Sequence, residues 1–412
     1  MKLFPHQDRA LNDTYKHNRV AYYLDMGLGK TFVGSEKMWE LNTPYNLLIC
    51  QKSKIDDWKE HFEQHYDYKV IVFDKQRMEE IPEESVLIVN YERAWRRDAL
   101  LKLNNFTLML DESSKIKNDK SKQTKFILRL NAENIILLSG TPTGGKYEEL
   151  WSQLHLLGWK INQKLFLKQF VVQEWDDRNS KYKITGYKNV ERLKAKLKQY
   201  GAVFMKTEEV FDLPETTDVK VKIPGTKLYK EFKKHHILEI GEELLIGDTP
   251  AAKKLYLRQL AGSYNENKLQ YVKDLVESTN DRIIIFYNFK KEYEALVDLI
   301  EKPISTVNGD LKDLSAYEKF ENSVTLIQYQ AGAMGLNLQK ANKIVYFTLT
   351  DKSELFEQSK KRTHRIGQER PCFYYYLLTD GSIEWRMLDV LKERKDYTDA
   401  LFEKEEDVID SK

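Results

Sequence analysis

Cysteine is nearly absent from this chain of 412 residues, which contains only Cys50 and Cys372. Two cysteines that border strand-like apolar runs exclude a disulfide framework and indicate buried thiols in a reducing compartment. The eight histidines lack the spacing of zinc ligands. No apolar run approaches the ~20 residues that cross a bilayer, and the first residues lack the apolar stretch of a secretory signal. We therefore expect a globular cytoplasmic protein without a membrane partner.

Excess charge is also small, because the formal net charge is only +2. The stretch from Lys160 to Lys206 departs from this balance, with 12 Lys/Arg against 4 Asp/Glu, a net of +8 (12 − 4). The rest of the chain then sums to −6 (2 − 8). Two interpretations of the basic stretch stay open: a solvated helical surface, or a contact with the phosphate backbone of a nucleic acid.

The length predicts two domains, which we place at residues 1–210 and 211–412. Short Val/Ile/Leu-rich runs alternate with longer amphipathic segments, a pattern typical of parallel sheets covered by helices on both faces. Strands are expected at 20–24, 46–50, 70–73, 86–90, 107–110 and 135–138, and again at 282–287, 304–307, 324–328, 344–347 and 373–378.

Between these two series, from about Leu150 to Gln270, the pattern becomes helical and charged. Asp212–Glu215 and Ile223–Gly225 contain the proline and glycine that favour linkers. The last ten residues, EKEEDVIDSK, indicate a polar tail.

A glycine-rich turn follows the first expected strand. Residues 25–31 read DMGLGKT, and an apolar helical segment continues to Leu41. A strand, a turn ending in Gly-Lys-Thr and a helix form the context of a phosphate-binding loop. Lys30 is then expected to reach the β- and γ-phosphates, and the Thr31 hydroxyl to ligate Mg²⁺. The alternative is a plain helix start, since Leu24 stands where the usual pattern has its first glycine. The predicted loop comprises Met26, Gly27, Leu28, Gly29, Lys30 and Thr31.

Two adjacent carboxylates end the expected strand FTLMLDE, at the edge where open parallel sheets bind ligands. Asp111 is suited to hold Mg²⁺, and Glu112 to orient or deprotonate an attacking water. Such a pair is otherwise a common loop start. Its position downstream of a phosphate-binding loop favours the catalytic interpretation.

Three further segments carry weaker signals. IILLSGTP places Ser139 and Thr141 after a strand, where they are suited to sense a γ-phosphate or to bind a nucleic-acid backbone, although an ordinary turn needs the same residues. QYQAGAMGLNLQ contains Gly332 and Gly335, which permit close approach to a phosphate. Near the start, Gln7 carries an amide that can read an adenine edge.

Residues 358–368 read QSKKRTHRIGQ and set Arg362 and Arg365 three positions apart. On a helix this spacing places both guanidinium groups on one face. Two such cations can clamp a polyphosphate as its charge redistributes during hydrolysis. Alone, the run is more typical of a solvated basic helix end. With a phosphate-binding loop elsewhere in the chain, we expect both arginines to act on a bound nucleotide.

In this order the segments resemble the Swi/Snf-type double-stranded-DNA translocases of helicase superfamily two, from about Leu3 to Arg386. The strings that carry the resemblance are DMGLGKT, DESSKIKN, LLSGTPTGGKYEELWSQLHLL, QAGAMGLNL and QSKKRTHRIGQERP. Among them, the ending HRIGQ is the most family-specific. The chain departs from the family pattern at Ser113-Ser114, where Ala-His is usual, and at Tyr329-Gln330, where Thr-Arg is usual.

The resemblance implies an α/β fold of two RecA-like parallel-sheet lobes, with helical insertions at about 155–205 and 225–265, and with Mg-ATP in the cleft between the lobes. It implies that the first lobe supplies Gln7, Lys30, Thr31, Asp111 and Glu112, and that the second supplies Gly335, Arg362 and Arg365, with Arg365 as the arginine finger. DNA contacts are implied at Lys52, Ser53, Asn90, Tyr91, Thr141, Asn288 and Gln330.

The expected function is a Mg²⁺-dependent, DNA-stimulated ATPase that translocates on duplex DNA as a monomer, in the manner of the bare motors of bacteria and their viruses. It would work beside other DNA-processing proteins. Two alternatives stay open. One is a strand-separating helicase or RNA motor. The other is a non-catalytic DNA-binding or partner-docking module with a degenerate ATP site.

Overall fold

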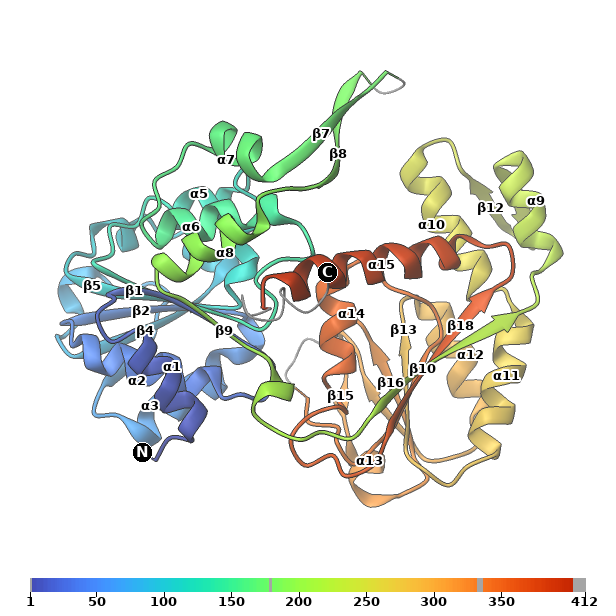
Figure 1. Cartoon of the computed structure of the whole chain (residues 1–412). Coiled ribbons are helices and arrows are strands. Elements are labelled where there is room, and N and C mark those ends of the chain that lie inside the picture. The colour runs from blue at the N-terminus through green and yellow to red at the C-terminus, as the bar shows by residue number, and fades with distance from the viewer. Residues whose placement is uncertain (1, 178–179, 332–335, 403–412) are drawn as a thin grey trace. The chain divides into compact units, whose positions relative to one another are not determined.

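The computed structural model describes residues 2–177, 180–331 and 336–402. The chain divides into two compact units (Figure 1). The first contains Met1–Val210 together with the segment that begins at Asp396, and the second contains Phe211–Lys395. The last helix, α15 (Ile383–Ala400), therefore begins in the second unit and ends in the first.

The first unit is built on a seven-stranded sheet in the order β3-β4-β2-β5-β6-β1-β9. All its pairings are parallel. Central strands are buried along nearly their whole length, which requires helices on both faces. Figure 1 shows α1, α2 and α3 on one side of the sheet and α5, α6 and α8 on the other. The strands are β1 Arg19–Leu24, β2 Tyr45–Cys50, β3 Lys69–Val72, β4 Ser85–Asn90, β5 Phe106–Asp111, β6 Asn134–Ser139 and β9 Ala202–Met205. The helices are α1 Pro5–Asp13, α2 Lys30–Leu41, α3 Ile55–His65, α4 Tyr91–Ala94, α5 Lys122–Ile127, α6 Trp151–Leu156 and α8 Val190–Gln199.

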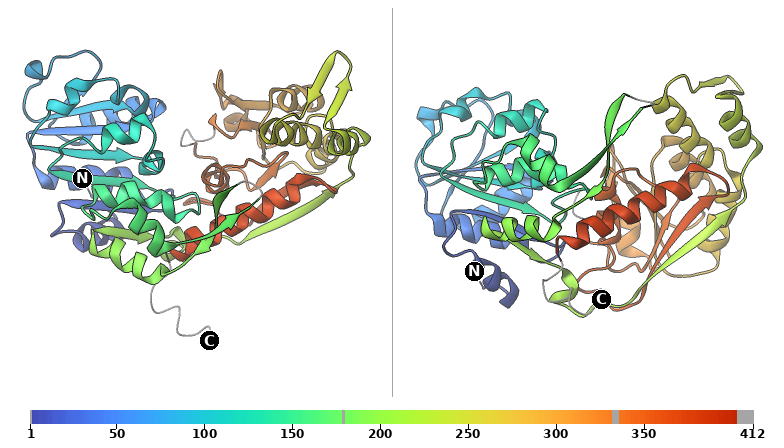
Figure 2. Two further views of the ribbon diagram at one scale, coloured as in Figure 1. Left: turned by 90° about the horizontal axis from the view of Figure 1, so that it is seen from above. Right: turned by 45° about the horizontal axis from the view of Figure 1, so that its top comes forward.

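The second unit is built on another seven-stranded sheet, in the order β10-β18-β17-β13-β16-β14-β15, in which only the edge strand β15 pairs antiparallel. Figure 2 gives two further views of both sheets with their helices. The strands are β10 Thr216–Ile223, β13 Ile283–Tyr287, β14 Ile304–Val307, β15 Lys312–Asp313, β16 Val324–Gln328, β17 Lys343–Tyr346 and β18 Cys372–Thr379. The helices are α11 Glu266–Glu277, α12 Lys290–Leu299, α13 Ser315–Lys319, α14 Ser353–Lys360 and α15.

Strand β13 illustrates how sequence alternation builds the core of the second unit. Ile283 and Ile285 pack with the apolar residues of α11 and α12, whereas Ile284 and Phe286 pack with those of α14 and α15. Successive side chains of a strand point to opposite faces, so one continuous apolar run contributes to two hydrophobic cores.

None of the helices in the described ranges is long and apolar enough to span a membrane.

The α/β class expected from the sequence is confirmed: both units are α/β lobes whose sheets are parallel apart from the edge strand β15. Each expected strand is present within about two residues of its predicted bounds. The strands that escaped prediction include β9 and β10, at the edges of the two sheets. β10 reads TTDVKVKI and is largely exposed, so it lacks the continuous apolar run of a central strand.

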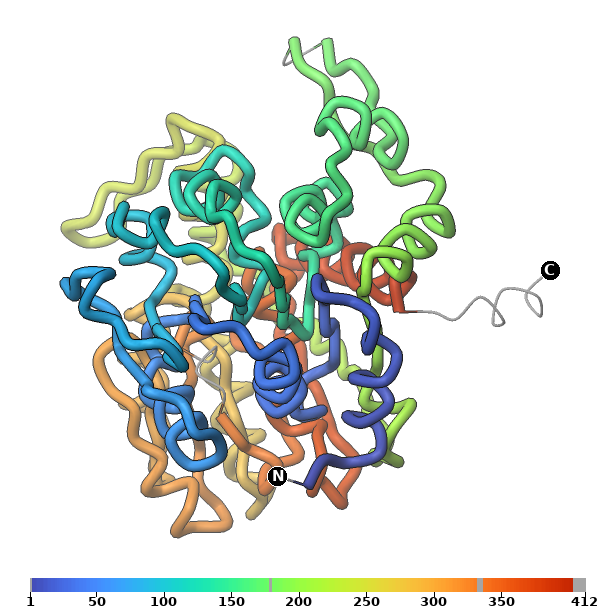
Figure 3. Tube along the Cα trace, turned by 90° about the vertical axis from the view of Figure 1, so that its left-hand side faces the viewer, coloured from blue at the N-terminus to red at the C-terminus, as the bar shows by residue number. Residues whose placement is uncertain are grey.

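The two insertions contain helices, and each also contains an antiparallel hairpin that the helical, charged pattern did not reveal (Figures 1 and 3). Both hairpins have mostly exposed residues, so no buried apolar run marks them in the sequence. The first insertion contains α7 Gln163–Phe170, β7 Val171–Asp176 and β8 Lys181–Tyr187, followed by α8. The second contains α9 Lys227–His235, β11 Ile237–Ile240, β12 Glu243–Ile246 and α10 Pro250–Ala261.

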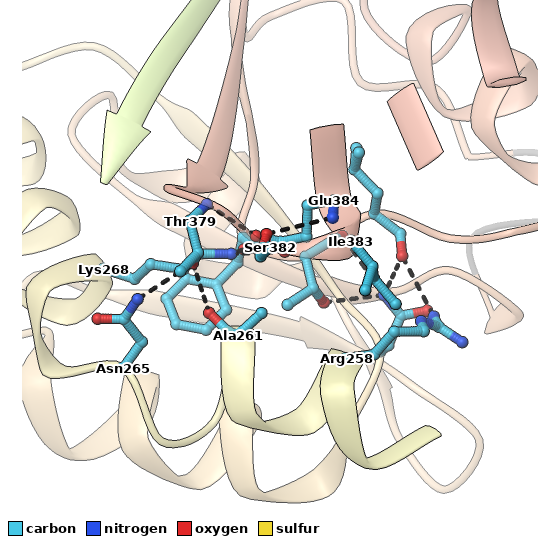
Figure 4. A network of polar contacts seen from close by, with 12 residues as sticks. Arg258, Ala261, Asn265, Lys268, Thr379, Ser382, Ile383 and Glu384 are labelled. Atoms are coloured by element: carbon cyan, nitrogen blue, oxygen red, sulfur yellow. Dashed lines mark hydrogen bonds and ion pairs between the residues drawn. The ribbon is translucent and has the colours of Figure 1, made fainter. Parts of the chain in front are cut away.

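A buried ion pair anchors α15 in the second unit (Figure 4). The Lys268 ammonium on α11 lies 2.7 Å from a Glu384 carboxylate oxygen on α15, and the two side chains are 0% and 2% exposed. Lys268 also donates to the Phe347 carbonyl at 2.7 Å. The other Glu384 oxygen accepts from the Thr379 amide at 2.9 Å. Four elements meet at these two charges, because Phe347 follows β17 and Thr379 ends β18.

Replacing Lys268 with methionine is expected to lower the free energy of local unfolding around α11 and α15 by about 3–5 kcal/mol, because Glu384 would keep a buried charge without its partner. Hydrogen exchange of peptides from the two helices measures this loss. Lys290→Met is the matched control, since the Lys290–Glu294 pair is exposed and such pairs contribute little. Equal protection in the two variants would contradict the role assigned to Lys268.

Candidate active site

Three turns of the first unit meet at one edge of its sheet. Strands β1, β6 and β5 are neighbours, and their register sets Tyr23 beside Ser139 and Asp111 beside Leu138. Because the strands are parallel, all three end at the same edge, where ligands of open α/β sheets bind. The glycine-rich turn, the carboxylate pair and the SGTP turn are thereby brought together.

The glycine-rich turn between β1 and α2 requires glycine at two positions. Gly27 has φ of +90° and Gly29 has φ of +76°, in the left-handed region that other residues rarely adopt. Gly29 is the residue before the first turn of α2, so the positive end of the helix dipole lies at the turn, where it favours an anion. The backbone of Met26–Thr31 is thus compatible with the predicted loop, and its contact with a phosphate stays a prediction.

Helix α1 packs against this turn through the side chain of Gln7. A Cβ added at Gly29 would lie 2.1 Å from the Gln7 amide nitrogen. Gln7 is 3% exposed. Its amide nitrogen donates to the Leu28 carbonyl at 3.2 Å, and its oxygen accepts from the Phe4 amide at 3.0 Å. The side chain expected to read adenine thus buttresses the loop here, and its contact with a base stays a prediction.

The Lys30 ammonium lies at the centre of the edge. It donates to the Leu24 carbonyl at 2.8 Å and to the Asp25 carbonyl at 3.2 Å. A Cβ at Gly140 would lie 3.2 Å from the same nitrogen. The SGTP turn therefore passes directly over Lys30. Leu24, which replaces the usual first glycine, ends β1 with its side chain in the core.

The carboxylate pair follows β5. The Trp58 indole donates to the Asp111 carboxylate at 2.8 Å. Burial raises the pKa of Asp111, while the bond from Trp58 and the nearby charge of Lys30 oppose that rise. Glu112 has φ of +57°, a left-handed conformation that is costly for a residue with a long side chain. The Ser139 hydroxyl donates to its carboxylate at 3.4 Å.

A buried glutamine that the sequence did not single out links three of the motifs. Gln153, on α6, has no exposed surface. Its amide oxygen accepts from the Ser113 hydroxyl at 2.8 Å and from the Tyr23 hydroxyl at 3.0 Å. Its nitrogen donates to the Pro142 carbonyl at 2.8 Å. The serine that departs from the family pattern is therefore bonded into the interior. A polar residue inside the apolar stripe WSQLHLL was the available signal.

Among the described residues of the second unit, Arg362 and Arg365 converge on one acceptor. Their NH1 groups lie 3.5 and 3.4 Å from the Leu336 carbonyl. The expectation that both sit on a helix is wrong, because α14 ends at Lys360 and the arginines follow in turns. Arg362 is 1% exposed, and burial lowers the pKa of Arg365. Gly335, predicted to contact the nucleotide, lies outside the described residues.

The ending HRIGQ serves the packing of the second unit. The His364 Nε2 is 2.9 Å from the Pro214 carbonyl, so it fixes the segment that leads into β10. Gly367 has φ of +89°, which favours glycine. The Gln368 amide donates to the Ala341 carbonyl at 2.8 Å and to the Thr363 carbonyl at 3.3 Å. These contacts to the carbonyls of Pro214, Ala341 and Thr363 fix the turn that contains the two arginines.

The side chains predicted to touch DNA differ in exposure within the first unit. Lys52 and Ser53 are exposed just after β2. Asn90 and Tyr91 are 4% and 1% exposed: the former caps α4 and the latter donates to the Asp111 carbonyl at 2.9 Å. The Thr141 hydroxyl is buried and has no partner among the described residues. Contact of these residues with DNA stays a prediction.

In the second unit, Gln330 is exposed. The Asn288 amide donates to the Thr348 hydroxyl at 2.8 Å. Its own backbone N–H donates at 2.9 Å to Glu292, a fully buried carboxyl that also accepts from Thr348 at 3.0 Å. Burial raises the pKa of Glu292 to about 7, although these hydrogen bonds oppose the rise. The turn that contains Asn288 thus depends on a buried acid.

A parallel-sheet lobe with a glycine-rich turn and two carboxylates at one edge, followed by a second such lobe with paired arginines, is typical of two-lobed, helicase-like nucleotide-binding proteins. Comparison with protein families agrees. The SNF2-related domain matches residues 22–270, and the helicase conserved C-terminal domain matches residues 267–367. Because the first match covers more than half of the chain, the chain belongs to the SNF2-related family.

Individual relatives are distant. The chain is 24% identical to the putative ATP-dependent helicase/translocase YwqA of Bacillus subtilis, over 92% of this chain and 46% of that protein. It is 26% identical to the SWI/SNF-related matrix-associated actin-dependent regulator of chromatin subfamily A-like protein 1 of Drosophila melanogaster, over 93% of this chain and 54% of the relative. It therefore spans about half the length of the curated relatives that it matches.

Among solved structures, the chain is similar to the Sulfolobus solfataricus SWI2/SNF2 ATPase core in complex with dsDNA. The two share 21% sequence identity with a TM-score of 0.47, over 97% of this chain and 92% of that one.

The raised pKa of Glu292 predicts a pH-dependent stability of the second unit. The folded state binds a proton up to about pH 7, whereas an unfolded glutamate releases it near pH ~4.3. Stability is therefore complete below the unfolded pKa and falls as pH rises to about 7, by on the order of 3 kcal/mol.

Glu292→Gln removes this titration and keeps an oxygen acceptor, so the variant should lose that part of the pH slope. Urea unfolding of both proteins at pH 5 and pH 8 measures the difference. If the unfolding free energy changed by the same amount between pH 5 and pH 8 in both proteins, the buried-acid assignment would be contradicted.

Proposed function

We propose that this chain is a Mg²⁺-dependent ATPase that DNA stimulates and that translocates along duplex DNA. The observation that carries the proposal is the position of the Lys30 ammonium, 3.2 Å from the Cβ position of Gly140 at the sheet edge where Asp111 and Glu112 also lie. Lysine, two carboxylates and glycine-rich backbone at one edge are the components of phosphoryl transfer to water.

In the first lobe, the backbone N–H groups of the turn hold the phosphates and Lys30 neutralises their β- and γ-oxygens. Thr31 and Asp111 hold Mg²⁺: a hydroxyl and a carboxylate are the hard oxygen donors that this cation takes. The position of Asp111 supports this role, because the bond from the Trp58 indole at 2.8 Å holds its carboxylate at the same sheet edge as Lys30. Mg²⁺ supplies charge neutralisation on the transferred phosphoryl group.

Glu112 orients and activates the attacking water. Its left-handed backbone turns it away from the run of β5, and the bond from Ser139 connects its carboxylate to the turn above Lys30. Strained conformations of this kind cluster at active sites, where surrounding contacts maintain them. The Gln153 contacts with Ser113 and Pro142 make one buried unit of the two turns.

In the second lobe, Arg362 and Arg365 stabilise the charge that develops on the γ-phosphate, with Arg365 as the finger. The support is that both guanidinium groups reach the Leu336 carbonyl and that Arg365, the more exposed of the two, is still half-buried. Two cations held near one acceptor by packing lose little entropy when an anion replaces that acceptor.

Duplex DNA is the proposed polymer. The support is the family itself, the similarity to the putative ATP-dependent helicase/translocase YwqA, and the net charge of +8 between Lys160 and Lys206. A stretch of this charge suits a phosphate backbone, whose binding is driven by counterion release. The exposed Lys52, Ser53 and Gln330 are the predicted contacts that remain accessible within their own units.

Arg365→Ala is expected to lower ATP turnover by ~10³–10⁵ while nucleotide binding is retained, because a finger acts mainly on the transition state. Turnover at saturating duplex DNA and binding of a fluorescent ATP analogue measure the two effects. The control is Arg370→Ala, which removes a nearby exposed arginine that pairs with Asp281. Near-wild-type turnover in Arg365→Ala would exclude the finger assignment.

The proposed activity itself is tested by ATP turnover with and without duplex DNA, beside displacement of a triplex-forming strand and unwinding of a forked duplex. We expect turnover that duplex DNA stimulates, triplex displacement that requires ATP, and no unwinding, with Lys30→Ala inactive in all three assays. Absence of turnover under every condition would favour a degenerate site, and unwinding without triplex displacement would favour a strand-separating helicase.

A further inference from the structure

The hairpin β7–β8 of the first insertion carries two large aromatic side chains in the open. Trp175 and Tyr182 are directly opposite in the antiparallel register. Their ring centroids are 5.1 Å apart with an interplanar angle of 74°. They are 53% and 65% exposed. The hairpin projects from the first unit beyond α7 (Figures 1 and 3).

The two faces of the hairpin differ in chemistry. Gln173 pairs with Ile184, two positions from the aromatic pair, so these four side chains share one face. Intervening pairs, Glu174 with Lys183 and Asp176 with Lys181, place opposite charges across from one another on the other face. One face is therefore charge-balanced for water, whereas the other presents a tryptophan and a tyrosine to solvent.

The segments that flank the hairpin are strongly basic, whereas strands β7 and β8 themselves are charge-balanced. The hairpin belongs to the stretch Lys160–Lys206 with its net charge of +8. Lys181 and Lys183 lie on the opposite face of the hairpin, across from Asp176 and Glu174. The exposed cations in the segment that follows β8 and on α8 are Lys188, Arg192 and Lys198. Aromatic rings interleaved with cations are the composition of surfaces that bind nucleic acid with unstacked bases. A positively charged surface repels a basic partner. It also adds nothing to the affinity for an uncharged, purely apolar partner.

We propose that Trp175 and Tyr182 stack on unpaired bases of DNA where a duplex is interrupted by a gap or a fork. This inference rests on the proposed function, since it names the DNA structure that the same motor engages. In intact duplex the faces of the bases are covered by their neighbours, so the two rings have no partner there. At an interruption the faces are open, and the basic residues hold the backbone beside them.

The test is the affinity of the full chain, without nucleotide, for fluorescent duplexes of one length that are either intact or carry a short central single-stranded gap. The wild-type protein should prefer the gapped duplex. Trp175→Ala/Tyr182→Ala should bind the gapped duplex roughly 5- to 100-fold more weakly, the loss expected for removing base–aromatic stacking, and should bind the intact duplex unchanged.

Two variants control for folding and chemistry. Trp175→Phe/Tyr182→Phe keeps two π faces and should restore most of the preference. Tyr15→Ala removes another exposed aromatic of the first unit, 76% exposed, and should leave both affinities unchanged. The aromatic double variant should also keep the salt dependence of binding, whereas Lys188→Ala/Arg192→Ala should reduce the log–log slope by about 0.7–0.9 for each phosphate that is no longer neutralised.

Unchanged gap affinity in the aromatic double variant would overturn the inference and leave the face to a protein partner. Equal weakening on gapped and intact duplex would also overturn it, since the hairpin would then contact the backbone alone. The proposed function fails separately: if intact duplex does not stimulate ATP turnover by the wild-type chain, the motor assignment falls, while a gap preference that depends on Trp175 and Tyr182 still supports base stacking.

Discussion

The parallel register that sets Tyr23 beside Ser139 and Asp111 beside Leu138 is the constraint on which the rest of the site depends. Neighbouring parallel strands have their carboxyl ends at the same edge of the sheet. Three short turns from distant parts of the sequence therefore become neighbours. Lys30 then needs only to fold back over the end of β1 to lie against the SGTP turn. The strand pairing of the first lobe thus sets the relative positions of its candidate site residues.

The sequence predicted what is repetitive and what is chemically unusual. Buried central strands are visible as apolar runs, and a strand followed by a glycine-rich turn ending in Gly-Lys-Thr is typical of phosphate-binding loops. The sequence did not predict Gln153 or Trp58, because their importance comes from which turns they touch, and those contacts join residues from different segments of the chain. The helical placement of Arg362 and Arg365 failed because a spacing of three fits a turn as well as a helix.

The second lobe shows how a family-specific string can owe its identity to packing. His364 and Gln368 bond to main-chain carbonyls, and Gly367 supplies a left-handed residue. None of the three is assigned a role in hydrolysis, yet together they hold the turn that presents the arginines. The buried Lys268–Glu384 pair acts in the same way at the other end of the sheet, where it fixes the start of α15.

The left-handed backbone of Glu112 has a consequence for how substitutions at that position are read. Glycine there would remove the carboxylate and relieve conformational strain together, whereas a β-branched residue would remove the carboxylate and add strain. The measured effect on turnover would then combine two contributions, the loss of the carboxylate and a change in backbone strain. The change in strain has opposite signs for the two substitutions. Glutamine keeps the shape and the backbone preference, so it is the replacement whose effect on turnover reports the carboxylate alone.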